Sequence, residues 1–250
     1  MGTFVGVDWG GKRWVTVEEH DGALSFATEP SFQAVCDRHS DSDLLFVDIP
    51  IGLPDNSNRY PRDCDEAARE LVHPTREASV FDVPARQAVQ AATYDSAREQ
   101  NLEVVEDDIG PQTWGIMERI HEVDVFMRES PPEVTVRESH PEVCFAALSK
   151  SESVVSDKSD AEGMERRLSI LETVSPSYRN AFEGLKQEIN SKAAWKRRIG
   201  VGMLDDVIDA LALVAAARLC SERGLEVLGG QTDSEGLSME IVYPDLEIQS

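Results

Sequence analysis

Short apolar runs separated by turn signals open the chain and predict four strands. The first run, TFVGVD, contains three apolar residues and ends in an acid. Two alternating runs flank an Asp-Gly turn and predict an antiparallel pair, whereas the continuously apolar fourth run, LLFVD, predicts a central strand. A short helix with Ser31 as its N-cap is expected before that strand. The predicted strands cover residues 3–8, 13–19, 23–28 and 44–48.

From residue 49 to about residue 132 the pattern changes to proline turns and amphipathic helices. The best-defined helix begins at Pro111, where a first-turn proline is tolerated, and its apolar residues recur at helical spacing as far as Met127. Later, the run DALALVAAARL predicts a buried helix. The other predicted elements are helices at 63–71, 85–100, 142–148 and 204–220, two helices between 160 and 204, and strands at 133–138 and 239–243.

Composition places the chain among ordinary globular proteins, with 41% hydrophobic and 28% charged residues in 250. No apolar run approaches the length that crosses a bilayer. The start, MGTFVGVD, has no basic region followed by a long apolar stretch, so we expect a cytoplasmic protein. The four cysteines are scattered and form no Cys-x-x-Cys pair, which predicts reduced thiols rather than disulfides or structural zinc.

The net charge of −23, from 47 acidic and 24 basic residues, is extreme for this length. Self-repulsion of this size destabilises a compact state in dilute buffer. In about 1 M salt the Debye length falls to about 3 Å and the repulsion is screened. The charge therefore favours a halophilic surface over a specific cationic partner. It disfavours a polyanion such as nucleic acid at low salt without excluding one.

Two aspartates follow predicted strands at equivalent positions. Asp8 ends the first strand before a Gly-Gly turn, and Asp48 ends the fourth strand before a stiff IPIGLP loop. If the two strands are neighbours, the carboxylates emerge together and require a cation or a shared proton. Each aspartate taken alone is also compatible with bonding of its own turn.

A third group of acids begins the apolar helix, in the sequence DDVID at residues 205–209. Asp206 and Asp209 are three residues apart and share a helix face. Acids in a first turn also stabilise the helix dipole, which accounts for one or two of them. It accounts poorly for Asp209, because burial increases at that point and an unpaired carboxylate would be costly.

Several carboxylates without clustered His or Cys suit Mg²⁺ or Mn²⁺ rather than zinc. Two such ions about 4 Å apart can activate a water and stabilise the leaving oxygen in phosphodiester hydrolysis. The acids therefore predict a metal-dependent nuclease.

Five segments together resemble the family known as domain of unknown function 429, which is described as predicted nucleases with a ribonuclease H-like fold. They run nearly from end to end and are GVDWGG, DIPIGLP, RDCDEAAR, ESHPEVCFAAL and DDVIDALA. The resemblance implies one α/β domain over residues 1–250, with a mixed five-stranded sheet, helices on both faces and a mainly helical insertion at about 55–130.

The segment DVIDALA also resembles an element of Holliday-junction resolvases, which share this fold. Those enzymes use an acid on the first strand, one on the fourth and two on the last helix. The resemblance implies that the catalytic, metal-binding residues here are Asp8, Asp48, Asp206 and Asp209. The fourth-strand acid is usually Glu in the resolvases, so Asp48 is the shorter residue.

The segment ESHPE is prominent in the family pattern. Glu138 ends the fifth strand and is a further candidate ligand, and His140 is a candidate for proton transfer or substrate contact because it titrates near neutrality. The alternative is that His140 and Glu142 only cap the following helix.

Basic residues are scarce, so their clusters are candidate contacts for substrate phosphates. One cluster, with Trp195 among its members, precedes the last helix and contains Lys192, Lys196, Arg197 and Arg198. Another follows the IPIGLP loop and contains Arg59, Arg62, Arg69, Arg76 and Arg86. Lys12, in the turn after the first strand, is a further candidate. Ion pairs with the many acids are the alternative for the arginines.

Two other functions remain open. The turn at Asp8–Lys12 resembles that of actin-like kinases, which would make the protein an ATP-dependent phosphotransferase, although no later adenosine-binding glycine motif is found. A non-catalytic nucleic-acid-binding or regulatory protein could also keep the fold and the carboxylates, and the acidic surface favours it over a nuclease.

Overall fold

The computed structural model describes residues 2–57, 62–72, 74–149, 160–191 and 203–245. The chain forms two compact units. The first unit contains residues 1–48, 132–226 and 243–250, and the second contains residues 49–131 and 227–242. The predicted helical insertion at about 55–130 falls within the second unit.

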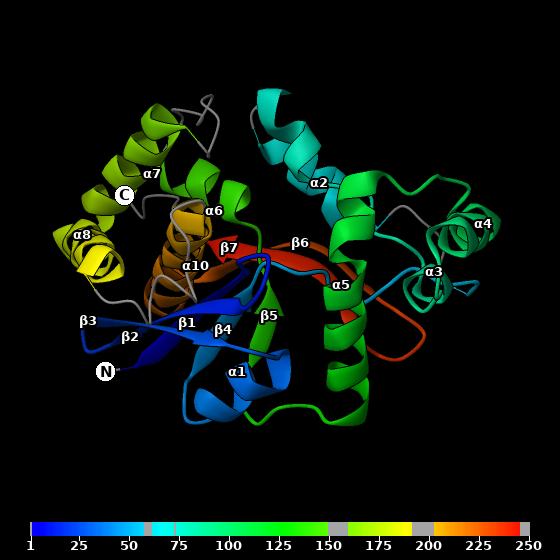
Figure 1. The fold of residues 1–250 in the computed structure, drawn as a ribbon, viewed down its shortest axis with the longest axis horizontal. Helices are drawn as coiled ribbons and strands as arrows, with labels where there is room; N and C mark the ends of the chain where they lie inside the picture. Colours follow the sequence, from blue (N-terminus) through cyan, green and yellow to red (C-terminus); the bar gives the residue numbers. More distant parts are fainter. Residues whose placement is uncertain (1, 58–61, 73, 150–159, 192–202, 246–250) are drawn as a thin grey trace. The chain divides into compact units, whose positions relative to one another are not determined.

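A mixed five-stranded sheet is the centre of the first unit (Figure 1). Its strands are β1 (Thr3–Trp9), β2 (Trp14–His20), β3 (Ala23–Glu29), β4 (Leu44–Val47) and β5 (Val136–Glu138). They lie in the order β3-β2-β1-β4-β5. β1 pairs antiparallel with β2 and parallel with β4, and β4 pairs parallel with β5. The predicted ribonuclease H-like α/β sheet is confirmed.

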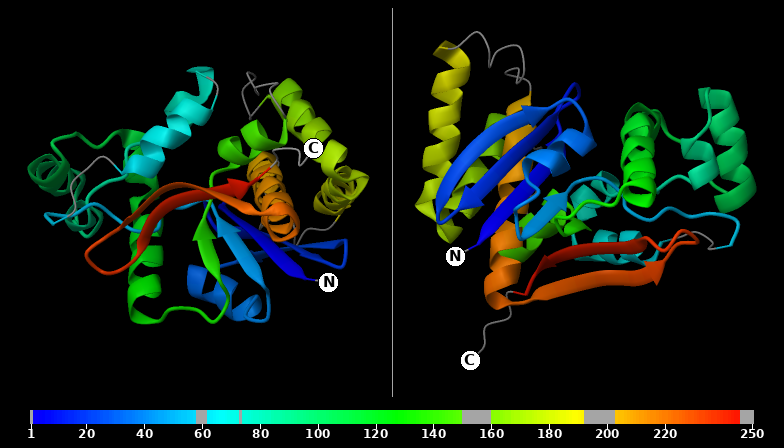
Figure 2. Two further views of the ribbon diagram at one scale, coloured as in Figure 1. Left: turned by 180° about the vertical axis from the view of Figure 1, so that it is seen from behind. Right: turned by 90° about the horizontal axis from the view of Figure 1, so that it is seen from below.

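Helices cover both faces of this sheet. On one face α10 (Leu204–Arg223) packs against β1, β2 and β4, and α8 (Pro176–Ser191) packs against β3. On the other face α1 (Phe32–Arg38) places the Phe32 ring 5.4 Å from the ring of Trp14. Figure 2 shows α10, in orange, alongside the strands. In the described part of this unit, the other helices are α6 (Pro141–Leu148) and α7 (Ala161–Val174).

A close approach between β1 and α10 depends on Gly6. A Cβ at this position would lie 2.1 Å from the carbonyl oxygen of Ala210 and 2.5 Å from the amide nitrogen of Val214. Only glycine lets a helix backbone come this near to the strand. The helix is buried along its length from Val207 to Ala217, as its apolar sequence predicts.

The second unit contains the mainly helical part of the chain. Its helices are α2 (Asp63–Leu71), the 3₁₀ helix η1 (Pro74–Ser79), α3 (Arg86–Val89), α4 (Tyr94–Val105) and α5 (Pro111–Glu129). A two-stranded sheet joins β6 (Leu225–Thr232) to β7 (Ser238–Pro244). The single helix predicted at residues 85–100 is wrong, because Thr93 caps a new helix by accepting a hydrogen bond from the Ser96 amide at 3.3 Å.

Buried ion pairs hold together distant segments of the second unit. Arg86 contacts three carboxylates, those of Asp55 at 3.4 Å, Asp124 at 3.1 Å and Asp233. Asp233, which follows β6, also accepts a hydrogen bond from the Leu53 amide at 3.1 Å. All four charged side chains are at least nine-tenths buried, so each depends on the others for its solvation.

Two further expectations concern the whole chain. In the part that the structure describes, no helix is long and apolar enough to cross a membrane. All four cysteines are buried free thiols, as their spacing predicts.

Candidate carboxylate site

The first two predicted acids lie side by side at one edge of the sheet. β1 and β4 pair in parallel with Val7 opposite Val47, and the Asp48 amide continues the ladder by donating to the Val7 carbonyl at 3.0 Å. Asp8 and Asp48 are therefore in register on neighbouring strands, which lie about 4.8 Å apart. In-register residues of parallel strands share a face, so both side chains lie on the same side of the sheet.

That side is the one covered by α10, because Gly6 and Asp8 are two residues apart on β1. α10 runs antiparallel to β1. A Cβ at Gly10 would lie 2.4 Å from Cε of Met203, whereas Gly6 faces residues 210–214. Four strand residues span about 13 Å, which matches about nine helical residues. This spacing agrees with both contacts.

The same alignment places the acids of α10. Asp8 lies two residues before Gly10, about 6.6 Å back along β1, and this corresponds to about four helical residues after Met203. Asp8 is therefore level with the turn that joins Asp206 to Asp209. By this alignment, the two strand acids and the two helix acids belong to the same end of the first unit.

Burial differs among these acids. Asp8 is 6% exposed and Asp209 only 2%, whereas Asp48 and Asp206 are half-buried. One carboxylate oxygen of Asp8 accepts the Trp9 amide at 2.7 Å. Asp209 is the buried helix acid that the sequence predicts, in a position where an uncompensated charge is expensive.

A buried thiol lies near two of the acids. Burial raises the pKa of the Cys144 thiol to about 12; the Ser139 hydroxyl opposes this shift, and the negative charges of Asp48 and Asp209 add to it. The Ser139 Oγ and Cys144 Sγ atoms are 3.2 Å apart. The sequence places Ser139 and Cys144 within ESHPEVC, but their polarity alone gives no sign that they lie beside the acids.

Glu138 and His140, from the ESHPE segment, have different positions. Glu138 pairs with Val47 rather than with Asp48, so strand alternation directs its buried side chain to the opposite face from Asp8 and Asp48. The sheet does not bring this predicted ligand to the others. His140 is the N-cap of α6, where its Nδ1 accepts the Glu142 amide at 3.2 Å. His140 therefore caps α6, and its role in proton transfer or substrate contact stays a prediction.

Glu142 also has a partner on another helix. Its carboxylate forms an ion pair with Arg167 of α7 at 2.5 Å, and both side chains are buried. The Arg167 guanidinium also lies 5.5 Å from the centre of the Phe145 ring.

The basic residues that are predicted to contact substrate phosphates differ in their exposure and in their partners. Lys12 is exposed in the turn after β1. In the second unit, Arg62 is 1% exposed and donates to the Gly52 carbonyl at 3.0 Å, and Arg69 donates to the Val80 carbonyl at 3.0 Å. These two arginines also pair with Asp65 and Asp82 respectively. Their contact with substrate stays a prediction. Arg59, Lys192, Trp195, Lys196, Arg197 and Arg198 lie outside the described residues.

The described side chains do not form a closed coordination shell. Within the described ranges, no group of three or more His, Cys, Asp or Glu side chains is placed so that it could hold a metal ion. The metal-binding role of Asp8, Asp48, Asp206 and Asp209 therefore stays a prediction.

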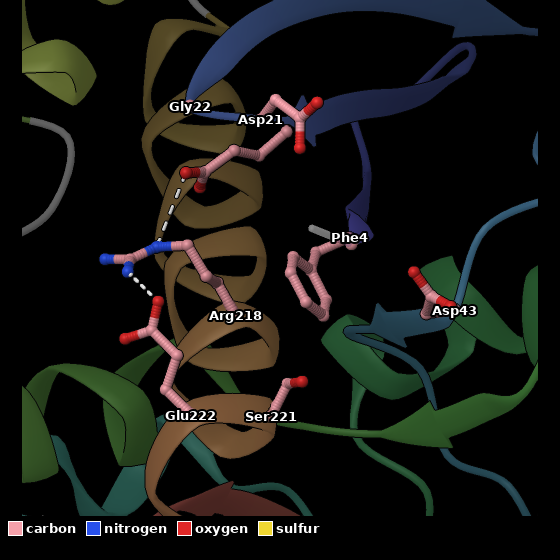
Figure 3. A pocket seen from close by; sticks show the side chains of 9 residues that line it. Phe4, Asp21, Gly22, Asp43, Arg218, Ser221 and Glu222 are labelled. Carbon is pink, nitrogen blue, oxygen red and sulfur yellow. Dashed lines mark hydrogen bonds and ion pairs between the residues drawn. The ribbon is translucent and has the colours of Figure 1, made fainter.

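A pocket of about 360 Å³ lies at the opposite end of β1, near Gly2 and Phe4 (Figure 3). There the Arg218 guanidinium pairs with Glu222 at 2.6 Å and with Glu19 at 3.4 Å. Glu19 also accepts the Tyr178 hydroxyl at 2.5 Å. Two carboxylates neutralise this guanidinium, so the pocket lacks the excess positive charge that a phosphate requires.

Comparison with known proteins identifies one family. A family model described as "Protein of unknown function (DUF429)" matches residues 6–232. No curated protein and no solved structure matches the chain. The matched range includes Asp8, Asp48, Asp206 and Asp209 and covers most of the 250 residues. The chain therefore belongs to the DUF429 family.

Proposed function

We propose that the protein is a metal-dependent nuclease that hydrolyses phosphodiester bonds with Mg²⁺ or Mn²⁺ held by Asp8, Asp48, Asp206 and Asp209. The observation that carries the proposal is that the β1 and β4 acids are in register on the sheet face that α10 covers, level with the first turns of that helix. The resemblance of DVIDALA to the resolvase element supports the same four residues.

The donor set fits the proposed ions. Four carboxylates provide hard oxygen ligands, which suit Mg²⁺ and Mn²⁺. Asp8 and Asp209 are both nearly fully buried at the same end of the unit. Burying carboxylates near one another is unfavourable unless a cation or a proton compensates them. Cation binding would remove that penalty and stabilise the unit.

When bound, a divalent ion supplies an activated water and stabilises the leaving oxygen. The protein's own groups orient the reactants around it. Because Nδ1 of His140 accepts the Glu142 amide, a neutral His140 ring carries its proton on Nε2. This N–H is the group that would donate to a substrate oxygen. Lys12, exposed after β1, would contact a neighbouring phosphate.

The proposal also concerns the cellular compartment and the salt concentration in which the protein acts. Four buried free thiols suit a reducing compartment such as the cytoplasm. The net charge of −23 suits concentrated salt, where screening would allow a polyanionic substrate to approach. We therefore expect activity to require high salt, which is the opposite of the usual salt dependence of nucleic-acid binding.

The test is cleavage of labelled single-stranded, duplex and branched DNA and RNA in 1 M KCl, with Mg²⁺, Mn²⁺ or EDTA, beside ATP turnover. The variants are Asp8→Asn and Asp209→Asn, and Asp41→Asn, an exposed acid of the same unit, is the matched control. We expect cleavage by the wild type and Asp41→Asn only. Metal-independent cleavage, or unchanged cleavage by Asp8→Asn, would refute the proposal, and ATP turnover without cleavage would favour the phosphotransferase.

A further inference from the structure

Trp9 is a half-buried aromatic residue that directly follows the Asp8 carboxylate. The two residues are linked by the hydrogen bond from the Trp9 amide to the Asp8 side chain, which has a length of 2.7 Å. Strand alternation directs the Trp9 side chain to the face opposite Asp8. β1 ends at Trp9. A ligand that passes around this end of the strand from the face that carries Asp8 therefore reaches the indole on the other face.

The Trp9 ring packs against a buried aromatic ring. It makes an edge-to-face contact with Trp14, with ring centres 5.3 Å apart and an angle of 65° between the planes. Trp14 is fully buried and packs in turn on Phe32. Trp9 and Trp14 are also paired across β1 and β2 as the last pair before the turn. A side chain already ordered by its neighbours loses little entropy when a ligand stacks on it.

The turn beyond this pair adds a positive charge. The Gly10 amide donates to the Arg13 carbonyl at 3.0 Å, and the Lys12 amide donates to the Gly10 carbonyl at 2.9 Å. This tight turn places the exposed Lys12 three residues from Trp9. The end of β1 therefore offers a partly accessible indole and an exposed ammonium group, whereas the buried Asp8 carboxylate lies on the opposite face of the sheet.

We propose that Trp9 is a stacking platform for an unpaired base of a DNA or RNA strand that lies across the β1 edge. The inference rests on the proposed nuclease function for the substrate class. Aromatic side chains bind single strands by stacking on bases, while cations contact the phosphates. A base inside a duplex is stacked and paired on both sides, so the site would select unpaired or displaced nucleotides.

The test is equilibrium binding in 1 M KCl with Ca²⁺, a hard cation of flexible coordination, in place of Mg²⁺. The probes are labelled dT20, labelled rU20, a 20-base-pair duplex and an abasic deoxyribose-phosphate strand of equal length. We expect dT20 or rU20 to bind about tenfold more tightly than the abasic strand. The dT20 and rU20 arms distinguish DNA from RNA.

Three variants separate stacking from packing. Trp9→Leu should weaken dT20 or rU20 binding about tenfold and leave abasic-strand binding unchanged. Trp9→Phe should retain most of the binding but lose the part of the tryptophan-fluorescence quenching that comes from Trp9. Trp114→Phe, which replaces a ring packed on Tyr94 in the second unit, should change neither. If circular dichroism shows that Trp9→Leu does not fold, the comparison of fluorescence quenching between the wild type and Trp9→Phe still tests the stacking role.

The outcomes separate this inference from the nuclease proposal. Equal binding of the abasic strand, quenching in Trp9→Phe as large as in the wild type, or no binding of any single strand overturns the stacking role. Base-dependent binding without metal-dependent cleavage retains the stacking role and removes the nuclease. Metal-dependent cleavage that Trp9→Leu leaves unchanged, in both KM and kcat, removes the stacking role alone.

Discussion

The substitution Gly6→Ala tests the contact that brings the helix acids to the strand acids. The new Cβ would lie 2.1 Å from the Ala210 carbonyl oxygen, whereas real Cβ contacts essentially never fall below 3.0 Å. The helix or the strand would have to move by about 0.9 Å, the difference between these values. Both nearest atoms belong to the backbone of α10, so no side-chain rotation relieves the overlap.

Overpacking of a core usually costs about 1–3 kcal/mol, and the backbone contacts place this variant at the upper end, about 3 kcal/mol. Urea unfolding in 1 M KCl, followed by circular dichroism, measures the loss. Gly184→Ala is the control: a Cβ there meets nothing within 4 Å, and Gly184 is exposed on α8. It should gain about 0.5–1 kcal/mol from helix propensity.

A Gly6→Ala protein within about 0.5 kcal/mol of the wild type would refute the close approach of α10 to β1. The alignment of Asp8 with Asp206 and Asp209 would then lose its basis. A destabilised variant that still binds Mn²⁺ with wild-type affinity would instead separate the packing from the metal site.

Three further predictions concern buried groups of the first unit and the thiols. Arg167→Met should lower the free energy of unfolding by about 3–5 kcal/mol, because the buried Glu142 carboxylate would lose the guanidinium with which it pairs; adding Glu142→Leu should restore part of this loss. Burial lowers the pKa of His39 below 6.5 despite the hydrogen bond to Glu18, so the unfolded chain binds more protons. Stability should therefore be full above pH 6.5 and fall as the pH drops through the lower folded pKa, and His39→Gln should flatten this slope in urea titrations. A thiol reagent at pH 8 should modify no cysteine of the native protein and all four after unfolding, since burial raises the pKa of Cys36 and Cys144 to about 12.

The sequence predicts elements well where one local signal dominates. Pro111 starts α5 where a first-turn proline is expected, and the apolar run after Asp209 forms the buried helix. Prediction failed where a short signal interrupts a longer pattern, as at Thr93, whose cap divides one expected helix into two. β6 was not predicted, because its exposed sequence LEVLGGQT contains two glycines and no alternating apolar face.

Candidate site residues were predictable to the extent that strand ends are predictable. Asp8 lies near the end of one recognisable strand and Asp48 follows another, and the pairing of those strands places the two residues in register. Glu138 also ends a strand, but the face on which its side chain lies depends on the register between β4 and β5. That register pairs Glu138 with Val47 rather than with Asp48, and no local sequence pattern encodes it. Nor does spacing show that Cys144 lies near Asp48 and Asp209, because that proximity arises from tertiary packing.

The contacts of Asp233 with Leu53 and Arg86 affect the order in which the second unit can fold during synthesis. Its carboxylate binds the amide of Leu53 and the guanidinium of Arg86, which precede it by 180 and 147 residues. Arg86 therefore emerges from the ribosome long before this partner exists. Contacts of such sequence separation form late and slow folding, so the buried Arg86 cluster is completed only after β6 and the turn that holds Asp233 have been synthesised.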